Sequence, residues 1–590
     1  ITPEKLYEVS QTVEGEAADK FGDLALICGA YDALCARQGA DPRDKLTKLA
    51  AALEECPWAE GRDIYIDCFT DFTAQERKVL EQLLRQAHSV TVALTCDKLT
   101  EGEEDVFSPA RRTALGLLSL AKKAGVTAEV ETRLTPPAPV AQGIGEIERN
   151  LFAPVIPVQK GIPAGVELYR ASSPFAEVER CAAALRQLIR EGGIRCREVA
   201  VTARSMETYG PLIDLIFPRY GLSVFLARMD DVLQKPILTL VTAALDAVAE
   251  DYAYEDMFRY LKTALAGLTP DETDRLENYA LKWDIRGQRW AQKADWAMHP
   301  QGYGLDWKEE DREEVRELDG LRRKVIAPLE KLRKTEEKTG KGLSLALYAF
   351  LEEIGLPQRL TARAGELRER GDAGLAAEYQ QLWEILCAGL EQCADLLGEM
   401  PMEWEEFGRL FKLVLSQYEV GVIPVSLDRI TAGEMPRLAH KRCKVLYILG
   451  ADDGQIPAVA PSPGLLQDED RIVLAQYGLE SAPKLTDKLW REMTIIYETC
   501  ALPSDRLIVS YPASGADGGE RRGSFLVKKL RTLFPDLPLR EEESGGGFRL
   551  SAPRPALEFA LQRPEVGRVL GEIPGYVPLL ERMERSTHLE

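Results

Sequence analysis

Tryptophans and basic side chains alternate within one short stretch of this chain. The stretch contains Trp283, Arg286, Arg289, Trp290 and Lys293. Aromatic rings stack on bases and cations bind phosphates, so this mixture predicts contact with single-stranded or duplex nucleic acid. The alternative is that the two tryptophans anchor a helix in a hydrophobic core. The sequence leaves both interpretations open.

Residues that commonly bind metals or act as nucleophiles are scattered along the chain. The 590 residues include four histidines far apart in sequence and 11 cysteines without a Cys-x-x-Cys pair. This pattern favours reduced cysteines in hydrophobic cores over a zinc site or a disulfide framework. It also argues against catalysis by histidine. We therefore predict no metal site.

ATP hydrolysis by a motor protein requires a Gly-rich loop that ends in Gly-Lys-Ser/Thr and holds the phosphates and Mg²⁺. The sequence contains no such loop. Gly340-Lys341 is followed by Gly342, and Thr335 stands where the first glycine is required. We therefore expect that this chain does not bind ATP productively.

The formal net charge of −21 argues against indiscriminate binding to nucleic acid. Contact with DNA would need a locally basic groove or a partner chain that supplies positive charge. The longest apolar stretch, Ile237–Ala249, is too short and too polar to span a bilayer. No membrane association is predicted, and a cytoplasmic protein is expected.

The elements that would position these residues begin with a βαβ unit. A strand at Asp63–Asp67, a helix at Gln75–Ala87 and a strand at Val90–Leu94 have the spacing of parallel strands joined by a helix. Residues before them, 1–58, are predicted to be helical.

A second set of strands lies on both sides of a long helical segment. Strands are predicted at Val166–Arg170 and Val199–Thr202, and again at Val445–Leu449 and Arg506–Ser510, whereas residues 236–416 have helical periodicity. This layout implies that the strands before and after the helices belong to one sheet. We predict the α/β class.

Several short motifs occur in an order that resembles one family of helicase-like proteins. They are Ile64–Glu76, Leu276–Trp283, Ile285–Trp290, Ile448–Pro457 and Leu507–Pro512. The layout resembles UvrD-like helicases, and the motifs resemble AddB (RexB), the B subunit of bacterial ATP-dependent helicase/deoxyribonucleases. The resemblance covers residues 60–535.

The resemblance implies two RecA-like domains, the second interrupted by a large all-helical insertion. Residues 1–58 are expected to be the end of a 1B-like helical subdomain, and residues 59–160 the C-terminal part of the first RecA-like domain. Residues 161–235 would begin the second RecA-like domain, residues 236–416 would form a 2B-like insertion, and residues 417–540 would be the return of the second domain. Residues 541–590 would be a linker toward a nuclease domain.

Alignment with active motors implies that the catalytic positions have been replaced. Asp67 matches the Mg²⁺ ligand, but Cys68 stands where a glutamate activates water, and a thiol is a poor substitute. We interpret Cys68 as a small core residue. Gly433 replaces a coupling histidine, and Leu502 replaces an arginine that would contact the γ-phosphate.

The resemblance implies a non-motor, DNA-threading role in a complex that resects double-strand breaks for recombinational repair, with scanning of the 3′-ended strand for a recombination hotspot. The implied partners are an AddA-type helicase–nuclease subunit, DNA ends and single-stranded DNA. We expect the chain to be the central part of a longer protein. That protein would supply ATP/Mg binding, a nuclease and a 4Fe-4S cluster, while this chain holds no cofactor. The alternatives are a self-sufficient helicase and a structural module that does not touch DNA.

Overall fold

The computed structural model describes most of the chain. The described residues are 2–38, 44–100, 104–132, 139–227, 230–231, 235–369, 373–420, 428–438, 442–458, 464–479, 483–541 and 546–571. The chain folds as two compact units, the first made of residues 1–227 and 427–590 and the second of residues 228–426.

The first unit begins with the predicted helices and the predicted βαβ unit. The helices are α1 (Pro3–Ser10), α2 (Glu16–Gln38) and α3 (Lys45–Glu55). Strands β1 (Asp63–Ile66) and β2 (Ser89–Val92) pair in parallel, with α4 (Ala74–Gln86) between them and α5 (Ser108–Lys123) after them. Thr73 starts α4 because its side chain and that of Glu76 form a capping box.

A seven-stranded sheet forms the centre of the first unit. Its strands are β3 (Val166–Ala171), β4 (Val199–Ala203), β5 (Val224–Ala227), β8 (Ile430–Glu434), β9 (Cys443–Leu449), β10 (Pro503–Pro512) and β11 (Leu539–Glu541). The spatial order is β11-β3-β10-β9-β4-β8-β5, and every neighbouring pair is parallel. The predicted α/β class is therefore confirmed. The RecA-like character of the domains and their boundaries stay predictions.

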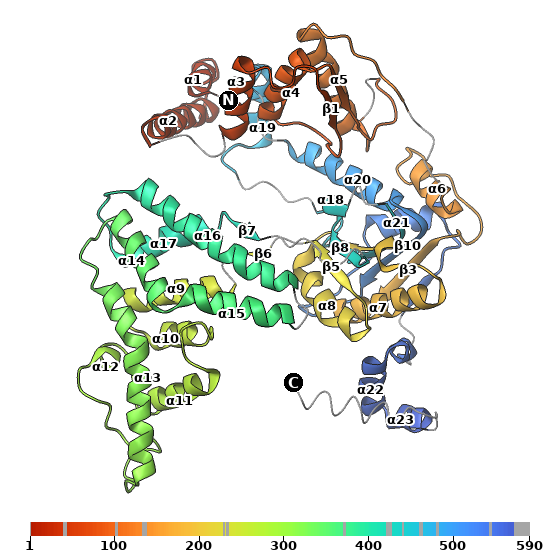
Figure 1. The fold of residues 1–590 in the computed structure, drawn as a ribbon. Helices are drawn as coiled ribbons and strands as arrows, with labels where there is room; N and C mark the ends of the chain where they lie inside the picture. The colour runs from red at the N-terminus through yellow and green to blue at the C-terminus, as the bar shows by residue number, and fades with distance from the viewer. Residues whose placement is uncertain are drawn as a thin grey trace. The chain divides into compact units, whose positions relative to one another are not determined.

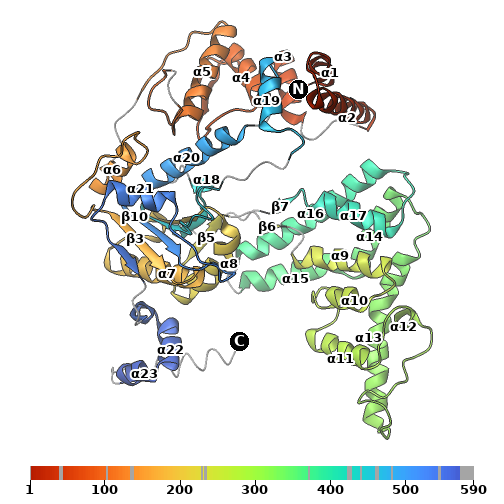
Figure 2. The same ribbon diagram turned by 180° about the vertical axis from the view of Figure 1, so that it is seen from behind.

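Helices cover both faces of this sheet (Figure 1). Because side chains alternate along a strand, Leu446 and Ile448 of β9 pack against one set of helices and Val445, Tyr447 and Leu449 against the other. The first set is α6 (Gln142–Asn150), α18 (Met435–Leu438), α20 (Leu485–Ala501) and α21 (Phe525–Leu533) (Figure 2). The second set is α7 (Pro174–Glu191) and α8 (Met206–Arg219).

Helix α19 (Asp468–Gln476) joins the N-terminal helices to the rest of the first unit. Its Leu474, together with Leu479 just beyond it, packs against Leu6 and Phe21 of α1 and α2. Lys20 also forms an ion pair with Asp470, at 2.9 Å between Nζ and Oδ2. Residues distant in sequence are thus held side by side.

Where the structure describes it, the second unit is helical apart from a short antiparallel pair, β6 (Asp230–Asp231) with β7 (Glu419–Val420). Its helices are α9 (Pro236–Ala249), α10 (Tyr254–Leu261), α11 (Pro270–Lys282), α12 (Gln288–Ala291), α13 (Glu309–Arg333), α14 (Gly340–Glu353), α15 (Leu356–Glu369), α16 (Ala373–Leu397) and α17 (Trp404–Leu415). All the buried residues of its core cluster lie within this unit. None of the described helices is long and apolar enough to cross a membrane.

The segment predicted as a linker, residues 541–590, carries helices where the structure describes it. Helices α22 (Pro553–Gln562) and α23 (Pro564–Gly571) follow the sheet, and Ala556 and Phe559 of α22 are buried. Residues 542–545 and 572–590 of the predicted linker lie outside the described part.

Candidate nucleic-acid interface

The chain turns sharply at the end of β1, where an active motor would hold Mg²⁺ and its general base. Asp67 and Cys68 are both exposed, and Cys68 adopts a left-handed conformation with φ of 71°. The backbone N–H of Cys68 donates to Oδ1 of Asp67 at 2.8 Å. The prediction that Cys68 is a small core residue is wrong, because the chain leaves the strand after Ile66 and turns the thiol toward solvent.

The Cys68 thiol is poorly suited to accept a proton from water. Partial desolvation raises its pKa, and the negative charge of Asp67 and a contribution from Glu498 of α20 raise it further. A thiol whose pKa lies above its ordinary value stays protonated near neutral pH. The side chain therefore lacks the carboxylate chemistry that activates a hydrolytic water.

Gly433 and Leu502 contribute no charged group. Gly433 lies in β8 between β4 and β5, and its carbonyl accepts a hydrogen bond from the Thr202 hydroxyl at 2.8 Å. Leu502 caps the end of α20 and packs against the core of the sheet. Among the described residues, no hydrogen bond or ion pair joins Asp67 and Cys68 to either position.

Arg204, which follows β4 directly, is held by a buried carboxylate. Its Nε and Nη2 donate to the two oxygens of Glu492 at 2.6 and 3.0 Å. Glu492 lies on α20, is buried, and also accepts the backbone N–H of Ala458 at 3.1 Å. A bidentate pair of this kind occupies the guanidinium.

A second buried carboxylate, which the sequence analysis missed, lies at the carboxyl ends of β9 and β10. Glu177 of α7 accepts hydrogen bonds from the Tyr209 hydroxyl at 2.7 Å, from the Gly450 N–H at 2.9 Å and from the Ser510 hydroxyl. Burial raises the pKa of Glu177 to about 7. Gly450 has φ of +65°, and a Cβ there would lie 2.6 Å from the Tyr209 ring. Only the convergence of strand ends in the fold could have indicated this cluster.

The tryptophan-rich stretch of the second unit is largely a structural anchor. Trp290 is fully buried, and the half-buried Trp283 donates from Nε1 to the His299 carbonyl at 3.0 Å. Trp290 therefore has no free face to offer a base in this conformation, whereas Trp283 is only partly covered.

The three cations of that stretch, in contrast, are exposed. Arg286 forms an ion pair with Asp284, and Arg289 donates to the Trp283 carbonyl at 3.0 Å. A role for Arg286, Arg289 and Lys293 in binding DNA stays a prediction.

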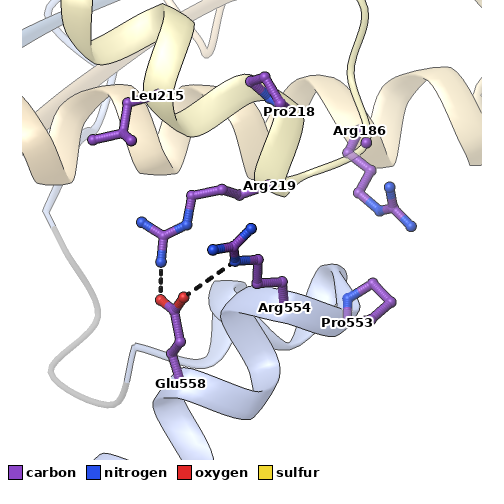
Figure 3. Close-up of a pocket in the computed structure, with 8 residues that line it drawn as sticks. Arg186, Leu215, Pro218, Arg219, Pro553, Arg554 and Glu558 are labelled. Carbon is purple, nitrogen blue, oxygen red and sulfur yellow. Dashed lines mark hydrogen bonds and ion pairs between the residues drawn. The ribbon is translucent and has the colours of Figure 1, made fainter. Parts of the chain in front are cut away.

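A pocket of about 610 Å³ lies between α8 and α22 (Figure 3). Arg219 and Arg554 both point at Glu558, and Arg554 Nε lies 3.7 Å from its carboxylate. Arg186 donates to the Ser551 carbonyl at 2.8 Å and to that of Tyr220. Because these arginines already bind partners on both sides, the pocket is best explained as the place where α22 docks.

Comparison with known proteins first defines a class. Residues 1–143 match the family model described as "ADDB, N-terminal".

Curated relatives extend the similarity to nearly the whole chain. It is 32% identical over 548 residues to the B subunit of the ATP-dependent helicase/deoxyribonuclease of Acetivibrio thermocellus, covering 90% of this chain and 48% of that protein. The protein of the same name from Clostridium tetani is 30% identical over 584 residues, covering 95% of this chain and 51% of the relative. The chain therefore spans about half the length of the curated relatives that it matches. The AddB resemblance predicted from the motifs is confirmed.

Proposed function

We propose that this chain is a DNA-threading part of the B subunit of a helicase–nuclease and does not itself drive movement. In this proposal the complex resects double-strand DNA ends for recombinational repair, and this part scans the 3′-ended strand for a recombination hotspot. The observation that carries the proposal is Cys68. An exposed, protonated thiol stands where an active motor needs a glutamate.

Two further features support a silent motor. Leu502 is an apolar side chain packed against the core, so it cannot stabilise charge on a transferring phosphoryl group. Arg204, which directly follows β4, is paired with Glu492. A self-sufficient helicase is the alternative that these residues oppose.

The proposed partner is an AddA-type subunit that supplies the motor force and acts on the same DNA end. We place ATP/Mg binding, the nuclease and a 4Fe-4S cluster in the remainder of the full-length protein. None of these groups is assigned to the residues of this chain.

An ATPase assay of the 590-residue chain with single-stranded DNA tests the silent motor. We expect no hydrolysis above background. A Cys68→Glu variant should also be inactive, because the chain contains no Gly-Lys-Ser/Thr phosphate loop. DNA-stimulated turnover by the unmodified chain would overturn the proposal.

The net charge of −21 favours a second candidate, a structural module that never touches DNA. Filter binding of single-stranded and blunt-ended DNA at about 50 and 200 mM salt separates the two. DNA threading predicts binding that weakens with salt, with a slope of about −0.7 for each phosphate contact on a single strand. Absence of binding at the lower salt would instead support the structural module.

A further inference from the structure

A groove of about 570 Å³ runs between α5 and the α19–α20 segment of the first unit. It is called the basic groove here. Its charged lining residues are Asp71, Arg77, Arg112, Arg471, Lys484, Asp487 and Arg491. The volume lies within the range of roughly 300–1,000 Å³ that is usual for pockets that bind ligands.

Positive charge is in excess in the basic groove although the chain as a whole is acidic. Five cations line it against two carboxylates, whereas the chain carries a net charge of −21. Both carboxylates are used in ion pairs across the groove. Arg112 of α5 pairs with Asp487 of α20 at 2.6 Å, and Arg491 of α20 pairs with Asp71. These pairs fix the two walls. Arg471 and Lys484 add further positive charge to the lining.

Two of the remaining cations have unused donors. The Arg471 side chain is only 9% exposed, and its Nη1 pairs with Asp468 at 2.6 Å. Its Nε is buried without a hydrogen-bond partner in the part of the chain that the structure describes. Lys484 is half-buried, and its Nζ likewise has no partner among the described residues. The buried Nε of Arg471 is costly unless a ligand or water completes it, whereas the Lys484 ammonium is available beside it.

The uncharged lining of the groove is largely apolar. It includes Leu117 and Leu120 of α5 and Leu479 beyond α19. A nucleic-acid backbone likewise combines charged and apolar parts, because anionic phosphates alternate with sugars whose carbon faces are apolar. A deep positive groove in an acidic body also concentrates such an anion locally.

We infer that the basic groove binds the phosphodiester backbone of single-stranded DNA, with Lys484 and Arg471 as phosphate donors. This inference rests on the proposed DNA-threading function and locates one contact of it on the first unit. The aromatic residue that lines the groove, Phe72, is buried, so this contact depends on phosphate and sugar rather than on a stacked base. The groove would therefore bind without preference for sequence.

The test is a Lys484→Glu variant of the whole chain, compared with Lys122→Glu. Lys122 is exposed in the last turn of α5 and does not line the groove, so both variants change the net charge equally. We expect Lys484→Glu to weaken binding of an unstructured oligonucleotide about tenfold at 50 mM salt, and to reduce the salt slope by about one contact. Lys122→Glu should change the affinity less than about twofold. Lys484→Gln, which avoids a new negative charge, should fall between them.

The outcomes distinguish the two proposals. If the unmodified chain does not bind DNA, the proposed function fails and the groove inference falls with it. If it binds, but Lys484→Glu and Lys122→Glu bind equally, only the groove inference is overturned. The last measurement is the thermal stability of both proteins with inorganic pyrophosphate at constant ionic strength. Thermal stabilisation of the unmodified chain but not of Lys484→Glu, with equal DNA binding by both, would identify a free phosphate ligand and overturn the DNA assignment.

Discussion

A fully buried carboxylate joins one helix and two strands of the first unit. Glu177 receives donors from α8, from the end of β9 and from β10, and its charged neighbours include Asp452 and Arg521 around Tyr209. Three donors favour the ionised form, but the cost of removing the charge from water is larger. That balance holds the pKa near 7 rather than at its ordinary value of 4.5.

The raised pKa of Glu177 predicts that the chain loses stability as pH rises. The folded state retains a proton that the unfolded chain releases above pH 4.5, so this stabilisation is complete below pH 4.5 and is lost through pH 7. Its full size is about 3 kcal/mol. Glu177→Gln should flatten the pH dependence of the urea midpoint between pH 5 and 8. An unchanged slope in that variant would contradict the assignment, and Glu207→Gln, at an exposed position of α8, serves as the control.

Helix α13 holds the chain segment before it in place through one buried arginine. Arg322 is 1% exposed, and its guanidinium donates to the carbonyls of Trp290, Gln292 and Ala294 at 2.7 to 3.3 Å. It also pairs with Asp319 at 2.7 Å and lies 5.3 Å from the centre of the Trp296 ring. The arginine thus replaces regular secondary structure as the support for this loop.

We predict that Arg322→Lys strongly destabilises the second unit. A lysine has no planar fork to hold three carbonyls and Asp319, so the loss should be about 3–5 kcal/mol. Urea unfolding and near-UV circular dichroism, which reports the packing of Trp290 and Trp296, would measure it. Arg323→Lys, which changes an exposed side chain that binds the other oxygen of Asp319, should cost about 1 kcal/mol or less. Equal effects of the two changes would refute the role of Arg322.

Sequence reasoning found the elements whose periodicity is strong. The β1–α4–β2 unit agrees closely with prediction, because alternating and helical hydrophobic patterns and a capping box mark it locally. It missed β5, β8 and β11, of which β5 and β11 are only four and three residues long. Strand β8 has a glycine near its end, which obscures the strand pattern.

Site residues were harder to predict, because their roles depend on partners far away in sequence. The sequence alone leaves Trp290 open to either DNA contact or core packing. The residue that holds its surroundings in place is Arg322, which lies on another helix and donates to the Trp290 carbonyl. Cys68 was placed in a core because thiols usually are, whereas its backbone turns left-handed after β1. Glu177 and the basic groove are defined only once distant strands and helices meet.

At the scale of the molecule, the second unit has a hydrophobic core made only of its own residues. Every buried residue of its hydrophobic cluster lies between Ile237 and Leu415. The chain leaves the first unit after β5 and returns before β8, and these two strands are neighbours in the sheet.

We therefore predict that each unit folds without the other. Residues 235–420 alone should show helical circular dichroism and a cooperative thermal transition. The remainder, with Ala227 joined to Asp428 by about eight Gly and Ser residues, should also unfold cooperatively, since such a linker spans the length of one short strand. Aggregation of both pieces under conditions where the intact chain is monomeric would contradict the prediction.

The strand order has a consequence for how the protein emerges from the ribosome. Of the seven strands of the central sheet, the three made first are β3, β4 and β5. They do not pair with one another; each pairs only with strands made after residue 427. At synthesis rates of about 5–20 residues per second, translation of the helical unit alone takes roughly 10–40 s, so all three strands wait at least that long for their partners. The order of translation thus exposes unpaired apolar strands in the nascent chain, and gives the helical unit time to fold first.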